Sequence, residues 1–284
     1  MSNIRLKPML GMMPECFGIL NITSDSFSDG GSFLLAENAK SQANALLSEG
    51  ADWIEVSGQS SNVKAELVSE EEEWSRISEI LPFLQNAHAK ISIDSFRPLV
   101  QAKALDFGVQ CLNDISGFTH PDAKSLLKER LLANKNVNLI VMHSHTSGIA
   151  KEKSSLDPSN VVPTILKFFE DRKRELLSWE ISEDRIYFDP GMGFFLGEDP
   201  ELSFAVLRDL KIILAKFPKL MVSVSRKSFL GNALGGLKVT DREFASLAVE
   251  IYLLQLGVPW IRTHNVKKIK QAEMLFKKLN LLPT

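Results

Sequence analysis

The chain has little of what membrane, secreted and nucleic-acid-binding proteins need. Only two of its 284 residues are cysteines, and Cys16 and Cys111 both lie in apolar runs, which is typical of reduced core thiols and excludes a disulfide framework. No apolar stretch approaches the roughly 20 residues of a membrane span, and residues 1–14 lack the apolar run of a signal peptide. Lys and Arg number 33 against 35 Asp and Glu, so the basic excess of a nucleic-acid binder is missing. We therefore expect a cytoplasmic protein with neither a nucleic acid nor a membrane as its partner.

No linker rich in Gly, Ser or Pro divides the chain. We expect a single domain over residues 1–284, in which residues 1–14 form an N-terminal extension. Short apolar runs without clean polar alternation recur along the sequence, as expected of strands that are buried on both faces. These runs are 16–22, 53–56, 91–93, 109–112, 139–142, 186–188, 220–224 and 258–261. Helical patterns lie between them at 39–48, 70–84, 98–107, 162–179, 201–217, 242–256 and 266–279.

The alternation of eight strand candidates with helices predicts a parallel sheet of the α/β class. A chain of 284 residues with eight such units matches the size of a single-domain (β/α)₈ barrel, often called a TIM-type barrel. An open doubly wound sheet is the alternative, because short apolar runs can be miscounted.

Polar side chains stand at the end of each predicted strand. They are Asn21, Glu55 and Ser57, Asp94, Asn113 and Asp114, His143, Asp189, Ser225 with Arg226 and Lys227, and Arg262 with His264. In a barrel the carboxyl ends of the strands meet on one rim, where barrel enzymes have their active sites. A single Asp, Asn or Ser there can equally be a helix N-cap. That all eight are caps is much harder to accept, since several precede further loop and not a helix.

The side chains on this rim differ in charge. Asp94 and Asp189 follow apolar runs, and a half-desolvated carboxylate in that position accepts hydrogen bonds from an amino-heterocycle. Arg226 and Lys227 supply cations after the seventh strand, and Arg262 and His264 after the eighth, where barrels frequently bind phosphate. A solvated basic loop is the alternative interpretation of Arg226 and Lys227. The rim thus predicts an acidic, hydrogen-bonding floor beside an anion pocket.

Cofactor motifs give no competing assignment. A Walker loop is missing, and the glycines of segment 191–197 are spaced wrongly for a dinucleotide loop and follow the sixth strand instead of the first. No Cys and His cluster has zinc spacing, so His143 and His145 fit a structural or substrate contact better than a metal site. The segment 25–31 is interpreted either as a loop that reaches over the site or as a surface turn.

Together these segments resemble the dihydropteroate synthase family. The stretch 17–31, FGILNITSDSFSDGG, matches the family's first signature, with Ser24 where the family usually has Pro. SIDS at 92–95, NDI at 113–115, MH at 142–143, DPGMGF at 189–194, SVSRKSFLG at 223–231 and IRTH at 261–264 follow in the family's order and spacing. The resemblance covers residues 16–279, and its first signature and SRKSF segment are highly specific.

The resemblance implies a transferase of folate biosynthesis. It would join 6-hydroxymethyl-7,8-dihydropterin pyrophosphate to 4-aminobenzoate, with 7,8-dihydropteroate and pyrophosphate as products. Carried onto this sequence, pterin contacts would come from Asp94, Asn113, Ile115, Met142, Asp189 and Lys227. Pyrophosphate contacts would come from Asn21, Arg262 and His264, with Mg²⁺ shared between Asn21 and the phosphates. Aminobenzoate contacts would come from Ser61, Phe194, Phe195, Ser225 and Arg226. Asp94, Asp189 and Lys227 would be catalytic, together with Asp25 in a closing loop.

The sequence departs from the family in two loops. After the second strand the family usually has GESTRPG, whereas residues 58–64 read GQSSNVK. After the sixth strand Phe195 and Leu196 replace the usual Gly and Lys. Both changes resemble the sulfonamide-resistant branch of the family. We hypothesise that the bulk of Phe195 narrows the pocket against sulfonamides; neutral drift in an ordinary housekeeping enzyme is the alternative.

Two other functions compete with the synthase. A methyltetrahydrofolate-dependent methyltransferase shares a pterin-binding barrel but should lack the cation cluster and the anion pocket. A catalytically inactive pterin-binding paralogue is conceivable because of the altered loop at 58–64. The C-terminal helical patterns carry more apolar surface than one face needs, which fits the homodimer implied by the resemblance, although core packing explains many of these residues too.

Overall fold

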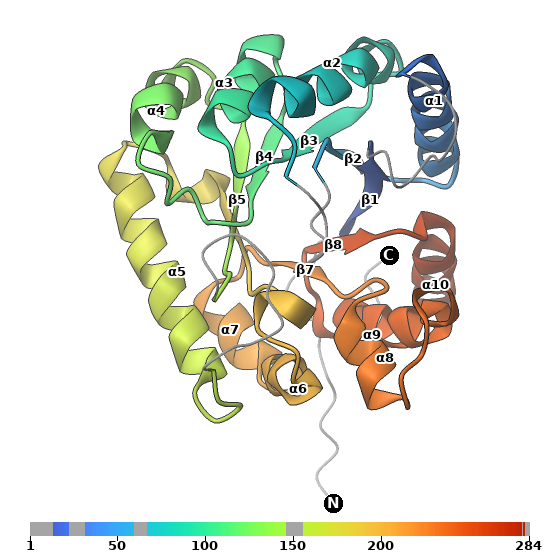
Figure 1. Ribbon diagram of the computed structural model, residues 1–284. Helices are drawn as coiled ribbons and strands as arrows, with labels where there is room; N and C mark the ends of the chain where they lie inside the picture. The colour runs from blue at the N-terminus through green and yellow to red at the C-terminus, as the bar shows by residue number, and fades with distance from the viewer. Residues whose placement is uncertain (1–13, 23–31, 60–66, 146–155, 280, 282–284) are drawn as a thin grey trace, which may run out of the picture.

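The computed structural model describes residues 14–22, 32–59, 67–145, 156–279 and 281. Within them, eight parallel strands form one sheet that curls into a ring, with helices around its outside (Figure 1). β1 (Glu15–Asn21) pairs with both β2 (Trp53–Ser57) and β8 (Trp260–Thr263). The sixth and seventh strands are the two ends of this sheet, and a parallel bridge between Phe188 and Leu220 links them. The predicted (β/α)₈ barrel is therefore confirmed, and the open doubly wound alternative is wrong.

The other strands are β3 (Lys90–Asp94), β4 (Cys111–Asp114), β5 (Asn138–Met142), β6 (Ile186–Asp189) and β7 (Met221–Ser223). The helices are α1 (Ser32–Ser48), α2 (Glu70–Asn86), α3 (Pro98–Phe107), α4 (Ala123–Ala133), α5 (Val161–Ser178), α6 (Pro200–Arg208), α7 (Leu210–Lys216), α8 (Ser228–Ala233), α9 (Glu243–Leu256) and α10 (Val266–Lys278). Among the described residues, no helix combines the length and apolar character needed to cross a membrane.

Local signals in the sequence account for several helix ends. α3 begins at Pro98, whose fixed φ suits a first helical position, and ends before Gly108, which adopts a φ of +100°. α2 begins after Ser69, whose Oγ accepts the backbone N–H of Glu72 at 3.1 Å. The ends of these helices therefore follow from their own residues. α2 leads into β3, and α3 leads into β4.

The segment predicted as one helix over 201–217 is two helices. α6 and α7 are separated at Asp209, which ends the first and precedes the second. Tyr252 on α9 donates its hydroxyl to the carbonyl oxygen of Leu207 at 3.0 Å, which satisfies a group left over in the last turn of α6. Helix α4 was absent from the sequence-based set because only three of its positions are buried, namely Ala123, Leu127 and Leu131.

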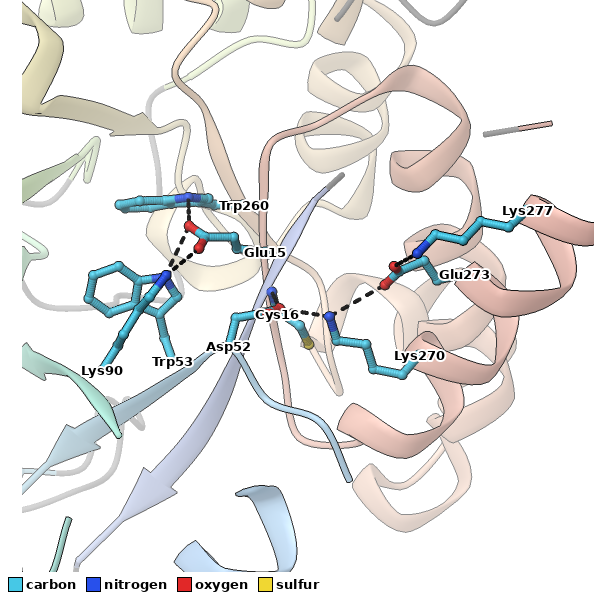
Figure 2. A network of polar contacts seen from close by, with 9 residues as sticks. All are labelled: Glu15, Cys16, Asp52, Trp53, Lys90, Trp260, Lys270, Glu273 and Lys277. Atoms are coloured by element: carbon cyan, nitrogen blue, oxygen red, sulfur yellow. Dashed lines mark hydrogen bonds and ion pairs between the residues drawn. The ribbon is translucent and has the colours of Figure 1, made fainter. Parts of the chain in front are cut away.

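The amino-terminal end of the barrel is closed by aromatic side chains. Phe17, Trp53 and Trp260 pack together there, and Tyr187 stacks on Trp260 with ring centroids 3.3 Å apart. The carboxylate of Glu15 accepts the indole N–H of Trp53 at 3.1 Å and that of Trp260 at 2.9 Å (Figure 2). Because both indole N–H groups have an acceptor, these large rings fill the end of the barrel without the free-energy cost of a buried, unpaired donor.

A line of ion pairs beside this aromatic end holds α10 to the first two strands (Figure 2). Asp52, just before β2, accepts the backbone N–H of Cys16 and the ammonium of Lys270, each at 2.7 Å. Lys270 also lies 3.4 Å from Glu273 on the same helix, and Glu273 lies 3.1 Å from Lys277. The first strand and the last helix are thereby joined across the whole length of the sequence.

Candidate active site

The carboxyl ends of the strands surround a cavity of about 280 Å³. Its lining consists of Ile19, Asn21, Glu55, Ser57, Asp94, Ser223, Ser225, Arg226, Lys227, Val239, Arg262 and His264. Seven predicted site residues, from β1, β3 and the ends of β7 and β8, are in this set. The prediction that the polar strand ends gather on one rim is therefore confirmed for these residues.

A buried ion pair lies at the floor of the cavity. Arg262 Nη1 is 2.5 Å from Glu55 Oε1 and 3.5 Å from Asp94 Oδ2. The other oxygen of Asp94 accepts from the Asn113 amide at 3.0 Å. Burial raises the pKa of Asp94 to about 7, against the nearby Arg262, which lowers it, and with the help of Glu55. Burial thus disfavours the charged form of Asp94, and Arg262 is the group that favours it.

Two acceptor atoms next to this floor have no hydrogen-bond partner within the described part of the chain. Asp189 is buried, and its Oδ1 accepts the backbone N–H of Gly191 at 2.8 Å while Oδ2 is unpaired. Asn113 Oδ1 is likewise unpaired. Burial raises the pKa of Asp189. Because buried polar atoms in proteins are nearly always paired, these two oxygens point to a ligand that brings N–H donors.

Lys227 stands between the acidic floor and an apolar wall. Its ammonium lies 4.7 Å from the centre of the Phe195 ring. Burial lowers the pKa of Lys227 to about 8, and the neighbouring Arg262 lowers it further, while Asp189 and Asp94 oppose both effects. At neutral pH the side chain is therefore a desolvated cation that faces two carboxyl groups.

The wall itself is a small apolar cluster of Ile115, Met142 and Phe195. Phe96 and Phe194 are partly buried and pack against it. None of the five lines the 280 Å³ cavity, so the cluster forms a neighbouring surface. A flat ring that sat on this surface would have Lys227 at its edge, because that ammonium already lies over Phe195.

Ser225 and His264 form the polar side of the cavity after β7 and β8. Ser225 Oγ accepts the backbone N–H of His264 at 3.1 Å and lies 3.1 Å from its Nδ1. Burial lowers the pKa of His264 to about 3, and the cations Arg226 and Arg262 add to this effect. The expectation of cations after β8 therefore holds for Arg262 and is wrong for His264, which the lowered pKa makes a neutral hydrogen-bonding group.

Glu55 is the functional residue to which sequence reasoning gave no role. It was noted only as a polar strand end, yet it pairs with Arg262 in the middle of an apolar strand. The alternation of Trp53, Glu55 and Ser57 along β2 puts every second side chain on the inner face, and this signal was available in the sequence. Asp25 and Ser61 lie outside the described residues.

The polar residues described at this end of the barrel include few candidate metal ligands. Within the described ranges, no three His, Cys, Asp or Glu side chains are grouped as a metal site. Asn21 presents its side chain to the cavity beside Arg226 and Arg262. One amide oxygen is a fitting partner for an ion that is held mainly by substrate phosphates.

A parallel barrel with acidic groups, cations and unpaired acceptors at its carboxyl end is typical of a barrel enzyme that binds a polar ligand.

The family model described as Pterin binding enzyme matches residues 17–264. Dihydropteroate synthase type-2 of Escherichia coli is 42% identical over 257 residues, which are 90% of this chain and 92% of that protein. Dihydropteroate synthase type-3 of Escherichia coli is 38% identical over 268 residues, 94% and 100% of the two chains. The structure of dihydropteroate synthase from Xanthomonas albilineans in complex with 7,8-dihydropteroate has a TM-score of 0.81 at 25% identity and covers 97% of both chains.

The chain belongs to the pterin binding enzyme family, and within it to the dihydropteroate synthases. It is a transferase that condenses 6-hydroxymethyl-7,8-dihydropterin pyrophosphate with 4-aminobenzoate to give 7,8-dihydropteroate and pyrophosphate. This agrees with the resemblance carried by the signature segments.

Proposed function

We propose that the pterin is held by Asp94, Asn113, Asp189 and Lys227, against the wall of Ile115 and Met142. The observation that carries this proposal is the pair of unpaired buried oxygens, Asp189 Oδ2 and Asn113 Oδ1. The amino and ring N–H groups of a pterin are donors that would satisfy them. The Lys227 ammonium is the matching donor for the acceptor atoms of the same ring.

The pyrophosphate group is assigned to the cavity between Asn21, Arg262 and His264. Arg226 and Lys227 line the same space, so three cations surround it. This supports an anion site, since the charge of a leaving group is best stabilised by fixed cations in a water-poor cavity. A Mg²⁺ ion held by Asn21 and the phosphate oxygens would neutralise part of that charge when bound.

The chemistry needs positioning and charge, and no nucleophile from the protein. The bond between the pterin methylene carbon and the pyrophosphate oxygen breaks, and the electron pair leaves with the oxygen. Asp94 and Asp189 stabilise the positive charge that develops on the carbon. The 4-aminobenzoate nitrogen then bonds to this carbon and loses a proton to water. Phe194, Phe195, Ser225 and Arg226 would orient the aminobenzoate, together with Ser61, while Asp25 would belong to a closing loop.

Pyrophosphate release tests this assignment against both alternatives. The purified protein, given the pterin pyrophosphate and 4-aminobenzoate, is expected to release one pyrophosphate for each dihydropteroate. A methyltransferase would release none, and an inactive paralogue would bind the pterin without turnover. Growth of a strain that lacks its own synthase, when it carries this chain, is the corresponding result in cells.

Reduced sensitivity to sulfonamides is proposed as well. Phe195 is only 4% exposed and packs with Ile115, Met142 and the Lys227 ammonium, so its bulk is fixed in the wall beside the aminobenzoate contacts. We expect sulfamethoxazole to inhibit the wild-type enzyme poorly, and Phe195→Ala to lower the ratio of the sulfamethoxazole inhibition constant to the KM for 4-aminobenzoate. The ratio is the measured quantity because Phe195 is itself assigned to the aminobenzoate site. Strong inhibition of the wild type in the low micromolar range would contradict this.

A homodimer that works in the cytoplasm as a single domain completes the proposal. Phe244 on α9 is 84% exposed, and Met274 and Leu275 on α10 are 65% and 63% exposed. Such large apolar side chains on neighbouring helices favour an interface with a second copy. The two cysteines are buried free thiols, as expected in a reducing compartment. Sedimentation of the purified protein at micromolar concentration distinguishes a dimer from a monomer.

A further inference from the structure

The loop that follows β7 has an unusual backbone at Arg226. This residue adopts a φ of +58°, a left-handed conformation that residues with a Cβ atom rarely adopt. The turn matters because Ser225, Arg226 and Lys227 all line the 280 Å³ cavity. A conformation that is disfavoured locally persists only where the surroundings hold it.

Two side chains hold both peptide groups of Arg226: Ser246 on α9, and Arg242, the residue directly before α9. Its backbone N–H donates to Ser246 Oγ at 2.8 Å, and its carbonyl oxygen accepts from Arg242 Nη1 at 3.1 Å. The Ser246 hydroxyl donates in turn to the Arg242 carbonyl oxygen at 2.8 Å. Ser246 is 4% exposed, so its hydroxyl is largely shielded from water. The hydroxyl therefore has one donor and one acceptor contact, and both are fixed.

Arg242 is itself positioned by close packing against the far end of the same loop. Its Nε donates to the Leu237 carbonyl oxygen at 2.9 Å. A Cβ atom at Gly231 would lie 2.4 Å from that Nε, so a larger residue at 231 would displace the guanidinium. The glycine that closes the SVSRKSFLG segment is thus explained by the approach of Arg242, a residue outside that segment.

We propose that Ser246 and Arg242 are positioning residues, which act through the backbone of Arg226 to aim the Arg226 and Lys227 side chains into the cavity. The proposal rests on the function assigned to this cavity above. Neither the Ser246 nor the Arg242 side chain lines the 280 Å³ cavity. Their effect on the reaction is exerted through the two cations.

Ser246→Ala and Arg242→Lys test the proposal in the full-length protein. Each is expected to lower kcat/KM for the pterin pyrophosphate by about 10-fold to 100-fold, because a displacement of about 1 Å in a site has consequences of that size. Ser246→Thr keeps the hydroxyl and is expected to retain most of the activity. Ser78→Ala is the matched control, since the Ser78 hydroxyl bonds only to Ser75 within α2.

The pH profile separates positioning from general loosening. Lys227 faces Asp189 on β6, Asp94 on β3, Glu55 on β2 and Arg262 on β8. If Lys227 is displaced toward water in Ser246→Ala, its pKa returns toward the ordinary higher value, and the alkaline fall of kcat/KM moves to higher pH. A change in overall stability alone would leave this limb in place.

The outcomes distinguish this proposal from the function on which it rests. A wild-type protein that releases no pyrophosphate overturns the proposed function. An active wild type with Ser246→Ala and Arg242→Lys both within twofold of it overturns the positioning role alone. Thermal unfolding followed by circular dichroism is measured for every variant. A loss of activity that merely follows the unfolded fraction, or that Ser78→Ala shares, also overturns the positioning role.

Discussion

Replacement of Lys227 by Ala is expected to lower kcat/KM for dihydropteroate formation by about 1,000-fold, because it removes a desolvated charge that faces the reacting group. The ammonium is buried beside Asp94 and Asp189. A water molecule that filled the space left by the lysine would be neutral, so it could not replace this positive charge. Burial lowers the pKa of Lys227 to about 8. The wild-type rate should therefore fall as pH rises through about 8, and Lys227→Ala should lack this alkaline limb.

Asp189→Ala is expected to abolish turnover in the same assay, and Asp189→Asn separates the loss of charge from the loss of shape. Lys219→Ala is the matched control for the lysine. Lys219 lies just before β7, whereas Lys227 follows it, so the two lysines are at opposite ends of the barrel. The Lys219 ammonium lies 5.0 Å from the centre of the Tyr187 ring. Near-normal kcat/KM in Lys227→Ala or Asp189→Ala would show that the pterin is held elsewhere.

Glu55→Ala is expected to lower the free energy of unfolding by about 3 to 5 kcal/mol, the usual result when one partner of a buried ion pair is removed. Glu55 is 2% exposed and its partner Arg262 is 7% exposed. Without Glu55, the guanidinium keeps only more distant carboxyl groups to offset its charge, Asp94 at 3.5 Å and Asp189 beyond ion-pair distance. The cost of removing the Arg262 guanidinium from water is then poorly compensated, which destabilises the native state relative to the unfolded chain.

Urea unfolding at pH 7 measures the effect, with Glu37→Ala as the control. Glu37 forms an exposed pair with Lys40 on α1, and such pairs contribute about 1 kcal/mol or less. Glu55→Gln keeps an oxygen acceptor for Arg262 and should fall between the wild type and Glu55→Ala. If Glu55→Ala is no more destabilising than Glu37→Ala, the pair is not a stabilising element of the barrel floor.

The barrel could be predicted from sequence because its strands are buried on both faces. The resulting short apolar runs are separated by helical patterns, and strong local signals such as Pro98 and Gly108 mark the helix ends. The division between α6 and α7 was not predicted from the sequence. The last turn of α6 accepts a hydrogen bond from Tyr252, 45 residues away from Leu207 in the chain, and no local pattern reveals such a contact. Contacts of that kind appear only when the helices are packed.

In the candidate site, too, local patterns were visible in the sequence and long-range contacts were not. Asp94, Lys227 and Arg262 were found because polar residues at strand ends interrupt apolar runs. The pairing of Glu55 with Arg262 was not found, since 207 residues separate them in sequence. Ser246 lies on α9, whose apolar composition indicates packing, and Arg242 directly precedes that helix. No local pattern connects these two residues with the loop after β7.

The aromatic end of the barrel decides how this protein can be observed. Trp53 and Trp260, two of its four tryptophans, are locked to Glu15 at the end opposite the cavity. Neither Trp74 nor Trp179 lines the cavity either. Intrinsic tryptophan fluorescence should therefore report the assembly of the barrel, because the indoles lose their aromatic packing only when the strands separate. The same emission is a poor reporter of ligand binding, and a titration of the site needs a probe introduced at the carboxyl end of the strands.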